Sequence, residues 1–233
     1  MASNLPDPSI LQKMRADWDQ RARENARYFI ATANEDWSEE EFFQSGRINV
    51  SDEVLTDMGN VCQGKDPKQM KVLEIGCGAG RITRALAEIF GEVYAVDVSG
   101  EMVEQARHSL RDVPNAHVFQ NSGADLRILG DIQFDFAFSY IVFQHIPSHA
   151  VIESYLNDVH RVLREGALFK FQVQGGDLHA TSDGPDTWLG VHFSESDARA
   201  LAERTGFEPR YLHGAGTQYF WLWFFRQPSQ AGI

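Results

Sequence analysis

The sequence is poor in cysteine, in long apolar runs and in positive charge. Its two cysteines, Cys62 and Cys77, are too few for the disulfide framework of a small secreted domain. No run approaches the roughly 18 apolar residues that a membrane-spanning helix needs. The first residues also lack the basic and then apolar pattern of a secretory signal, so we expect a cytoplasmic protein without a membrane partner.

The sequence has 21 Lys and Arg residues but 33 Asp and Glu residues, which gives a formal net charge of −12. Proteins bind nucleic acids largely through Lys and Arg contacts to phosphates, so this balance disfavours a nucleic-acid partner. No group of His, Cys and carboxylate residues has the spacing of a metal site, and we expect no structural metal. The sequence does not indicate an oligomeric state.

The 233 residues divide by pattern into an N-terminal helical segment (1–66), an α/β domain (67–226) and a flexible tail (227–233). In the first helix, Asp7 can cap and Pro8 can occupy the first turn, and apolar residues then recur three or four apart to about residue 29.

Two shorter helices are expected before the α/β domain. Ser38 and Glu41 have the spacing of a capping box, and Gly46 is expected to end the helix that they begin. A further helix is expected over residues 52–60.

The α/β domain is expected to be a doubly wound, mostly parallel sheet of seven strands that ends in an antiparallel hairpin. Strands that alternate with helices indicate parallel pairing, whereas the last two strands are too close in sequence for a parallel return. The expected strands are residues 71–75, 92–97, 116–120, 134–139, 168–173, 207–212 and 218–226. The expected helices are residues 81–90, 100–111, one that begins after Ser148, and 194–205.

A glycine-rich turn follows the first expected strand. Gly76, Gly78 and Gly80 let the backbone approach a ligand without an intervening Cβ atom, and Glu74 precedes them by two residues. A negative charge at that position suits a ligand with an ammonium group and does not suit a pyrophosphate. Asp97, which closes the second strand, is placed to accept hydrogen bonds from ribose hydroxyls.

These features resemble the class I methyltransferases that depend on S-adenosylmethionine (SAM). The resemblance rests on residues 72–80, on residues 93–97, and on residues 134–145 with Pro147. It implies a Rossmann-like fold, SAM as the methyl donor and S-adenosylhomocysteine (SAH) as a product. It also implies a donor site made of Glu74, Gly76, Cys77, Gly78, Gly80, Asp97, Val98, Met102, Ser122, Gly123, Ser139, Tyr140, Gln144 and Tyr28. Relatives often carry an Asp where this chain has Ser122, so the adenine contact differs there.

Further residues are candidates for the acceptor side. His145, after the fourth strand, is the best-placed general base if the acceptor arrives protonated, although a structural role is the alternative. Gln174 at the end of the fifth strand, His179 and His192 near a Gly- and Asp-rich loop, and Trp18 in the first helix are candidates for the acceptor pocket. The N-terminal helices are expected to form a lid that excludes water.

The sequence therefore predicts methyl transfer from SAM to a small-molecule acceptor by in-line displacement, driven mainly by proximity and desolvation. A SAM-binding protein without catalysis is an alternative, since its donor site would look the same. An NAD-linked oxidoreductase is a weaker alternative, because Arg81 stands where the dinucleotide fingerprint has its third glycine. The acceptor and its methylated atom are not specified by these residues.

Overall fold

Seven strands form one sheet in the computed structural model of the chain, which describes residues 6–176 and 186–228. The strands are β1 (Lys71–Ile75), β2 (Glu92–Asp97), β3 (Ala116–Gln120), β4 (Phe134–Phe138), β5 (Leu163–Val173), β6 (Phe207–His213) and β7 (Phe220–Arg226). Their order is β3-β2-β1-β4-β5-β7-β6. The first five are parallel, and β7 runs antiparallel to both β5 and β6. The parallel strands and the antiparallel hairpin of β6 and β7 confirm the prediction.

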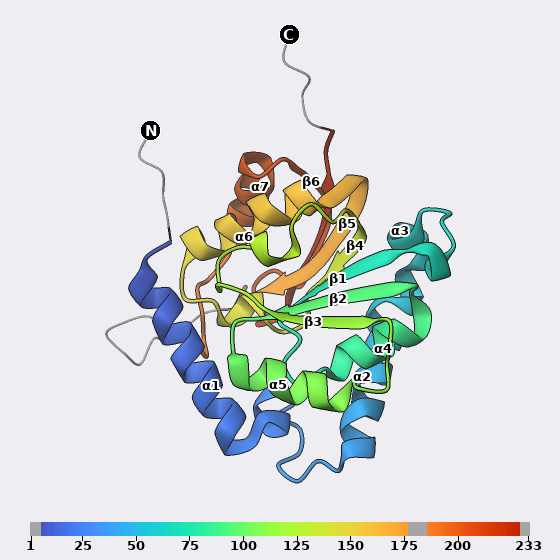
Figure 1. Cartoon of the computed structure of the whole chain (residues 1–233). Coiled ribbons are helices and arrows are strands. Elements are labelled where there is room, and N and C mark those ends of the chain that lie inside the picture. Colours follow the sequence, from blue (N-terminus) through green and yellow to red (C-terminus); the bar gives the residue numbers. More distant parts are fainter. Residues whose placement is uncertain (1–5, 177–185, 229–233) are drawn as a thin grey trace.

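Helices cover both faces of this sheet (Figure 1). They are α1 (Pro8–Ile30), α2 (Glu39–Glu53), α3 (Met58–Cys62), α4 (Arg81–Ile89), α5 (Gly100–Ser109), α6 (His149–Val162) and α7 (Glu195–Arg204), with 3-10 turns η1 (Leu55–Asp57), η2 (Pro67–Gln69), η3 (Arg127–Leu129) and η4 (Phe143–His145). The apolar residues of α6 and α7 pack on one face, and those of α2 to α5 pack on the other. No helix in the two described ranges is both long and apolar enough to cross a membrane.

The chain reverses direction across the sheet at β1. It builds β2 and β3 on one side of β1 and then returns to place β4 on the other side. Open α/β sheets bind ligands at the carboxyl ends of the strands beside such a reversal. The glycine-rich turn after β1 lies at that point, and α1 runs beside α5 at the same edge of the molecule (Figure 1).

Helix α1 begins as the sequence predicts, because Asp7 caps it by accepting a hydrogen bond from the Ser9 backbone N–H at 2.8 Å. Its backbone leaves the helical conformation at Asn25 (φ −166°, ψ 84°), so the last turn points in a new direction. That turn carries Phe29 and Ile30 towards the glycine-rich turn after β1. The kink thus allows α1 to cover the edge of the sheet with its end.

The prediction that Gly46 ends the second helix is wrong, since α2 continues to Glu53. The capping box of Ser38 and Glu41 is present as predicted. Gly46 lies where α2 meets α4, and a Cβ atom there would lie 2.4 Å from the Arg81 carbonyl oxygen. Glycine is therefore required for close packing of two helices rather than for termination.

The single helix predicted over residues 52–60 is also wrong. Instead, α2 ends within that range, the turn η1 follows, and α3 continues to Cys62. Strand β5 begins at Leu163 rather than at residue 168, across a register shift opposite Phe134 and Phe136. Leu163 pairs with Phe134, and the polar residues Arg164 and Glu165 fall within the shift, so the start of β5 does not show the apolar pattern of a buried strand. The other predicted elements differ from the structure only at their ends.

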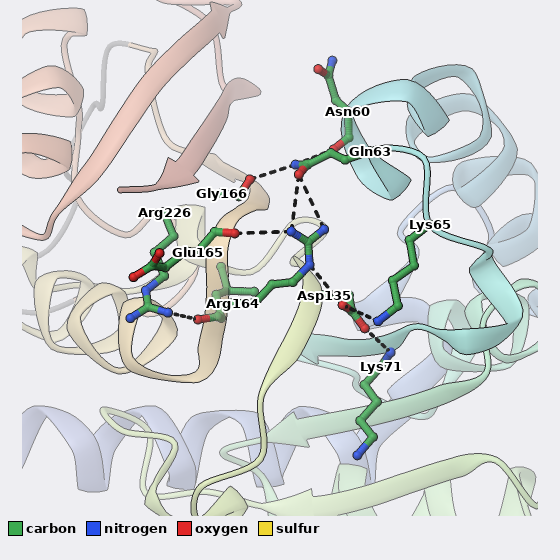
Figure 2. A network of polar contacts seen from close by, with 10 residues as sticks. Asn60, Gln63, Lys65, Lys71, Asp135, Arg164, Glu165, Gly166 and Arg226 are labelled. Carbon is green, nitrogen blue, oxygen red and sulfur yellow. Dashed lines mark hydrogen bonds and ion pairs between the residues drawn. The ribbon is translucent and has the colours of Figure 1, made fainter. Parts of the chain in front are cut away.

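A polar network joins the amino ends of β1, β4 and β5, opposite the glycine-rich turn (Figure 2). Asp135 accepts hydrogen bonds from the Lys65 ammonium at 2.8 Å, the Arg164 guanidinium at 3.0 Å and the Lys71 backbone N–H at 2.9 Å. Burial alone would raise the pKa of Asp135, but these donors hold it below its usual value. The ionised carboxylate therefore ties the segment before β1 to the two strands.

Replacing Asp135 by Ala should lower the free energy of unfolding by about 3 kcal/mol, because two cations and a backbone N–H lose their acceptor. Chemical denaturation at pH 7 measures this change. Asp112→Ala is the matched control, since Asp112 pairs with Arg84 at the surface and should change stability little. Equal effects of the two substitutions would contradict this role for Asp135.

Candidate functional site

The glycine-rich turn after β1 presents bare backbone to the edge of the sheet. Gly76 and Gly78 have φ values of 80° and 52°. A Cβ atom on Gly76 would lie 2.2 Å from the Val142 side chain, and one on Gly78 would lie 2.7 Å from the Ile30 side chain. Glycine at these two positions therefore allows the Val142 and Ile30 side chains to pack directly against the turn.

Asp97 lies beside this turn, at the end of β2. Its carboxylate accepts one hydrogen bond from the Gly78 backbone N–H at 2.8 Å and another from the Ser99 N–H at 2.9 Å. Burial raises the pKa of Asp97 to about 6, although these backbone hydrogen bonds oppose the shift. Asp97 thus joins the glycine-rich turn to the start of α5 and is ionised at neutral pH.

Glu74 lies beneath the turn and is 3% exposed. Its carboxylate accepts a hydrogen bond from the Thr83 hydroxyl at 2.6 Å. Burial raises the pKa of Glu74 to about 7, and the neighbouring charge of Asp97 acts in the same direction. Two carboxyl groups with raised pKa values make this end of the sheet favourable for a cationic ligand group.

A cavity of about 90 Å³, here named the inner cleft, opens above the turn. The predicted site residues that line it are Trp18, Glu74, Gly76, Cys77, Gly78, Asp97, Val98, Met102, Tyr140 and His145. Further lining residues that sequence reasoning missed are Met14, Phe29, Ile30, Ile75, Arg81, Ile82, Val96, Ile141, Val142, Ile146 and Tyr155. Most of these are apolar, so the sequence signal that they carried was that of an ordinary core.

Several predicted residues lie outside the inner cleft. Gly80 faces Leu110, because a Cβ atom there would approach that side chain at 2.9 Å. The Ser122 hydroxyl accepts hydrogen bonds from two backbone N–H groups of its own turn, and Gly123 faces Val98. The Ser139 hydroxyl donates to the Ile75 carbonyl at 2.8 Å and thereby fixes the end of β1.

Tyr28, Gln174 and His192 also lie outside the cleft. Tyr28 packs edge-on against Phe29, with a ring separation of 5.3 Å. Gln174 accepts a hydrogen bond from the Gly176 N–H at 3.1 Å, and His192 contacts the Gly175 carbonyl at 3.2 Å. Both polar side chains thus pair with backbone groups of the turn after β5. His179 lies outside the described residues.

A second cavity of about 320 Å³, here named the outer hollow, adjoins the inner cleft. The two share Phe29, Ile30, Arg81, Tyr140, Ile141 and His145. Residues of the outer hollow alone are Ala31, Thr32, Ala33, Trp37, Ser45, Ile48, Asn49, Gln144, Trp188, Gln218 and Tyr219. Gln144, which the resemblance assigns to the donor site, lines the outer hollow. The shared residues make the two cavities a continuous pair.

His145 lies where the two cavities meet and is 7% exposed. Its Nδ1 atom contacts the Trp188 carbonyl oxygen, which can only accept, so Nδ1 carries the proton. Burial lowers the pKa of His145 to about 4, and the hydrogen bond to Trp188 opposes this. The imidazole is therefore neutral at pH 7, with an unprotonated Nε2 atom.

Helix α1 and residues 186–188 cover the cavities together. The Thr187 hydroxyl donates to the Asp17 carboxylate at 2.6 Å. The Arg21 guanidinium lies over the Trp18 ring at 4.7 Å and over the Trp188 ring at 5.3 Å. Thr187 and Asp17 are 170 positions apart in the sequence, so their contact was not predictable from local pattern.

The comparisons with known proteins agree with this geometry. Residues 72–166 match the family described as methyltransferase domain. An uncharacterized methyltransferase of Staphylococcus carnosus (strain TM300) is 31% identical over 145 residues, which cover 60% of this chain and 60% of that protein. The chain thus spans less than two thirds of the length of this curated relative, and only 37% of the length of another.

Solved structures share the fold. The DhpI–SAH complex has a TM-score of 0.66 at 17% identity, covering 96% of this chain and all of that chain (100%). The magnesium protoporphyrin IX methyltransferase of Synechocystis PCC 6803 with bound SAH has a TM-score of 0.67 at 17% identity, covering 93% and 99%. Residues 72–166 therefore match a methyltransferase domain, and the chain shares the fold of these two solved structures.

Proposed function

We propose that the chain transfers the methyl group of SAM to a small-molecule acceptor, with SAM bound in the inner cleft. The observation that carries this proposal is the contact of Asp97 with the Gly78 N–H, where the backbone of the turn lines the inner cleft. In this arrangement a ribose can lie at Asp97 while the rest of the ligand follows the bare backbone. The chemistry of the residues therefore fits an adenosyl group.

Three parts of the donor, the ribose, the adenine and the ammonium group, have matching residues in this proposal. Asp97 accepts hydrogen bonds from the ribose hydroxyls, and Val98 and Met102 provide an apolar slot for the adenine. Glu74 offers negative charge to the ammonium group, and its raised pKa of about 7 falls once a cation is nearby. The inner cleft thus offers apolar side chains to the adenine and acidic side chains to the ribose and the ammonium group.

SAM supplies an electrophilic methyl group on a sulfonium. The chain contributes two adjoining cavities that place donor and acceptor side by side, with Tyr140 and His145 at their junction. Positioning of this kind supplies roughly 7–11 kcal/mol of the barrier reduction in favourable cases. Helix α1, the main part of the N-terminal segment, excludes water and acts as the lid in this proposal.

His145 is proposed as the proton acceptor for acceptors that arrive protonated. The Trp188 carbonyl holds the ring so that Nε2 is the free basic nitrogen. A pKa of about 4 makes this nitrogen a weak base, so it assists proton loss and does not ionise the acceptor in advance. An acceptor that is already anionic needs no such help.

The acceptor is proposed to be a small molecule because of the outer hollow. Its volume of about 320 Å³ exceeds that of the inner cleft, which it adjoins through shared lining residues. The formal net charge of −12 opposes contact with a phosphate backbone. This chain spans only part of the length of the curated relatives, so the substrates of those relatives do not specify its acceptor.

Transfer itself is tested with SAM labelled in its methyl group and a panel of phenols, amines and carboxylic acids. We expect SAH to form only when an acceptor is present, together with labelled product. Binding of SAM without transfer to any acceptor would favour the alternative of a SAM-binding protein without catalysis. Reduction or oxidation of a substrate with NAD would favour the oxidoreductase alternative.

The affinity for SAH should depend on pH through the two carboxyl groups. Both have pKa values above their ordinary ones, about 6 for Asp97 and about 7 for Glu74, so acid leaves them protonated and neutral. Because SAH binds their ionised forms, its affinity should rise as pH increases from 5 to 8. Calorimetric titration across that range measures the change. Asp97→Asn should remove the part centred near pH 6, and a flat profile for the wild type would contradict the proposed contacts.

A further inference from the structure

Arg81 is a buried cation at the boundary of the two cavities. It is the first residue of α4, is 4% exposed and lines both the inner cleft and the outer hollow. Burial lowers its pKa, but a guanidinium stays charged at neutral pH. A positive charge therefore lies within a mostly apolar enclosure.

The contacts of Arg81 leave this charge without an ion pair. Its Nη1 atom donates to the Ser45 hydroxyl at 3.1 Å and to the Asn49 side-chain carbonyl at 2.5 Å, both of which are neutral. Its Nε atom is buried and has no hydrogen-bond partner in residues 6–176 and 186–228. No ion pair to Arg81 is present in those ranges either. A buried cation in this state is costly unless a ligand completes its contacts.

Glu74 interacts with Arg81 electrostatically but does not replace that missing partner. The Glu74 carboxylate accepts from the Thr83 hydroxyl instead of from Arg81. The planar fork of a guanidinium matches the paired oxygens of a carboxylate or a phosphate group. Arg81 thus has an unpaired Nε–H on a group that suits an oxyanion.

The rest of the outer hollow is suited to an apolar body. Phe29, Trp37 and Tyr140 contribute aromatic rings to its walls. At its surface, Ile48 is 51% exposed, Trp188 36% and Tyr219 47%. Large apolar side chains that gather around one cavity indicate a place where an apolar ligand is covered.

We propose that Arg81 binds an oxyanion of the acceptor, so that the acceptor is a small molecule with a carboxylate, phosphate or phosphonate group on an aromatic or other apolar body. This proposal rests on the proposed function, because it assigns the outer hollow to the acceptor. Arg81 is then a specificity-determining residue that selects anionic acceptors over their neutral isosteres. Its position at the boundary places the oxyanion close to the donor.

The rival role for Arg81 is to bind the carboxylate of the donor itself. The two roles differ in which ligand loses affinity when the guanidinium is removed. Arg81→Met keeps most of the apolar stem and removes the charge, and Arg81→Lys keeps the charge without the fork. Arg84→Met is the matched control, because Arg84 lies one turn along α4, pairs with Asp112 and lines neither cavity.

The experiment saturates each protein with SAH and then titrates benzoate, phenylphosphonate and the neutral isostere benzamide. For the wild type we expect at least one of the two anions to bind about tenfold or more tightly than benzamide. Arg81→Met should abolish that preference while the affinity for SAH changes less than threefold, and Arg81→Lys should keep part of it. Arg84→Met should behave as wild type. Comparison of the two anions distinguishes a carboxylate site from a phosphonate site.

Two results would overturn the proposal. One is a wild-type protein that binds SAH but shows no preference for either anion over benzamide. The other is an Arg81→Met protein that loses SAH affinity and keeps its anion preference, which would assign Arg81 to the donor. Failure of the wild type to bind SAH would instead count against the proposed function. If Arg81→Met does not fold, as judged by thermal unfolding, the wild-type preference and Arg81→Lys still decide.

Discussion

Replacing Asp97 by Ala should weaken SAH binding about a hundredfold in calorimetric titration at pH 7.5. In the proposed complex the ionised carboxylate accepts hydrogen bonds from two ribose hydroxyls. Hydrogen bonds to a charged group contribute roughly 1.5–3 kcal/mol each. Their combined loss of about 3 kcal/mol corresponds to about a hundredfold in Kd. The free energy of unfolding should change by only about 1 kcal/mol, because burial raises the pKa of Asp97 and makes its ionised form unfavourable in the folded state.

Glu92→Ala provides the matched control for this result. Glu92 begins the same strand, lies at its opposite end and pairs with His117 at the surface. We expect Glu92→Ala to bind SAH as the wild type does. A Kd for Asp97→Ala within threefold of the wild-type value would show that this carboxylate does not hold the donor.

Replacing Gly76 by Ala should both destabilise the protein and impair SAH binding. The φ value of 80° disfavours any L side chain, and the added Cβ atom would lie 2.2 Å from Val142. Backbone strain of about 1–2 kcal/mol and overpacking of about 1–3 kcal/mol together suggest a loss of about 3 kcal/mol in the free energy of unfolding. Since Val142 lines the inner cleft, its displacement should also raise the Kd of SAH about tenfold or more.

Two variants separate strain from collision at Gly76. Gly64 has a φ value of 85° with no atom near its absent Cβ, so Gly64→Ala should show the strain alone and bind SAH normally. The double variant Gly76→Ala with Val142→Ala should recover part of the lost SAH affinity, because the colliding side chain is shortened. If Gly64→Ala and Gly76→Ala had equal effects on stability and binding, close packing at Gly76 would not be the cause.

The sequence predicted the core of this fold because its local signals are strong. The capping box at Ser38, the apolar strands β1 and β2, and the short connection before β7 each depend on neighbours in sequence. The prediction for Gly46 was wrong because glycine occurs both at helix ends and where two helices pack closely. Only the position of α4 in space distinguishes them.

The places of Glu74 and Asp97 beside the glycine-rich turn were predictable for a similar reason. Glu74 lies two residues before the first glycine of the turn, and Asp97 is the last residue of β2. Both positions are recognisable in the sequence, and both residues line the inner cleft. Gln174 and His192, by contrast, satisfy backbone groups of their own turn, and this cannot be seen without the path of the chain. The place of Arg81 was equally hidden, because its partners Ser45 and Asn49 lie on α2, more than 30 positions earlier.

The central claim is that the inner cleft binds an adenosyl methyl donor, and calorimetric titration of the wild-type chain with SAM, SAH and NAD tests it most directly. We predict that SAM and SAH each bind at one site per chain and that NAD gives no heat of binding. Binding of NAD, or no binding of either adenosyl ligand, would contradict the account and reduce the turn after β1 to a structural feature of the sheet.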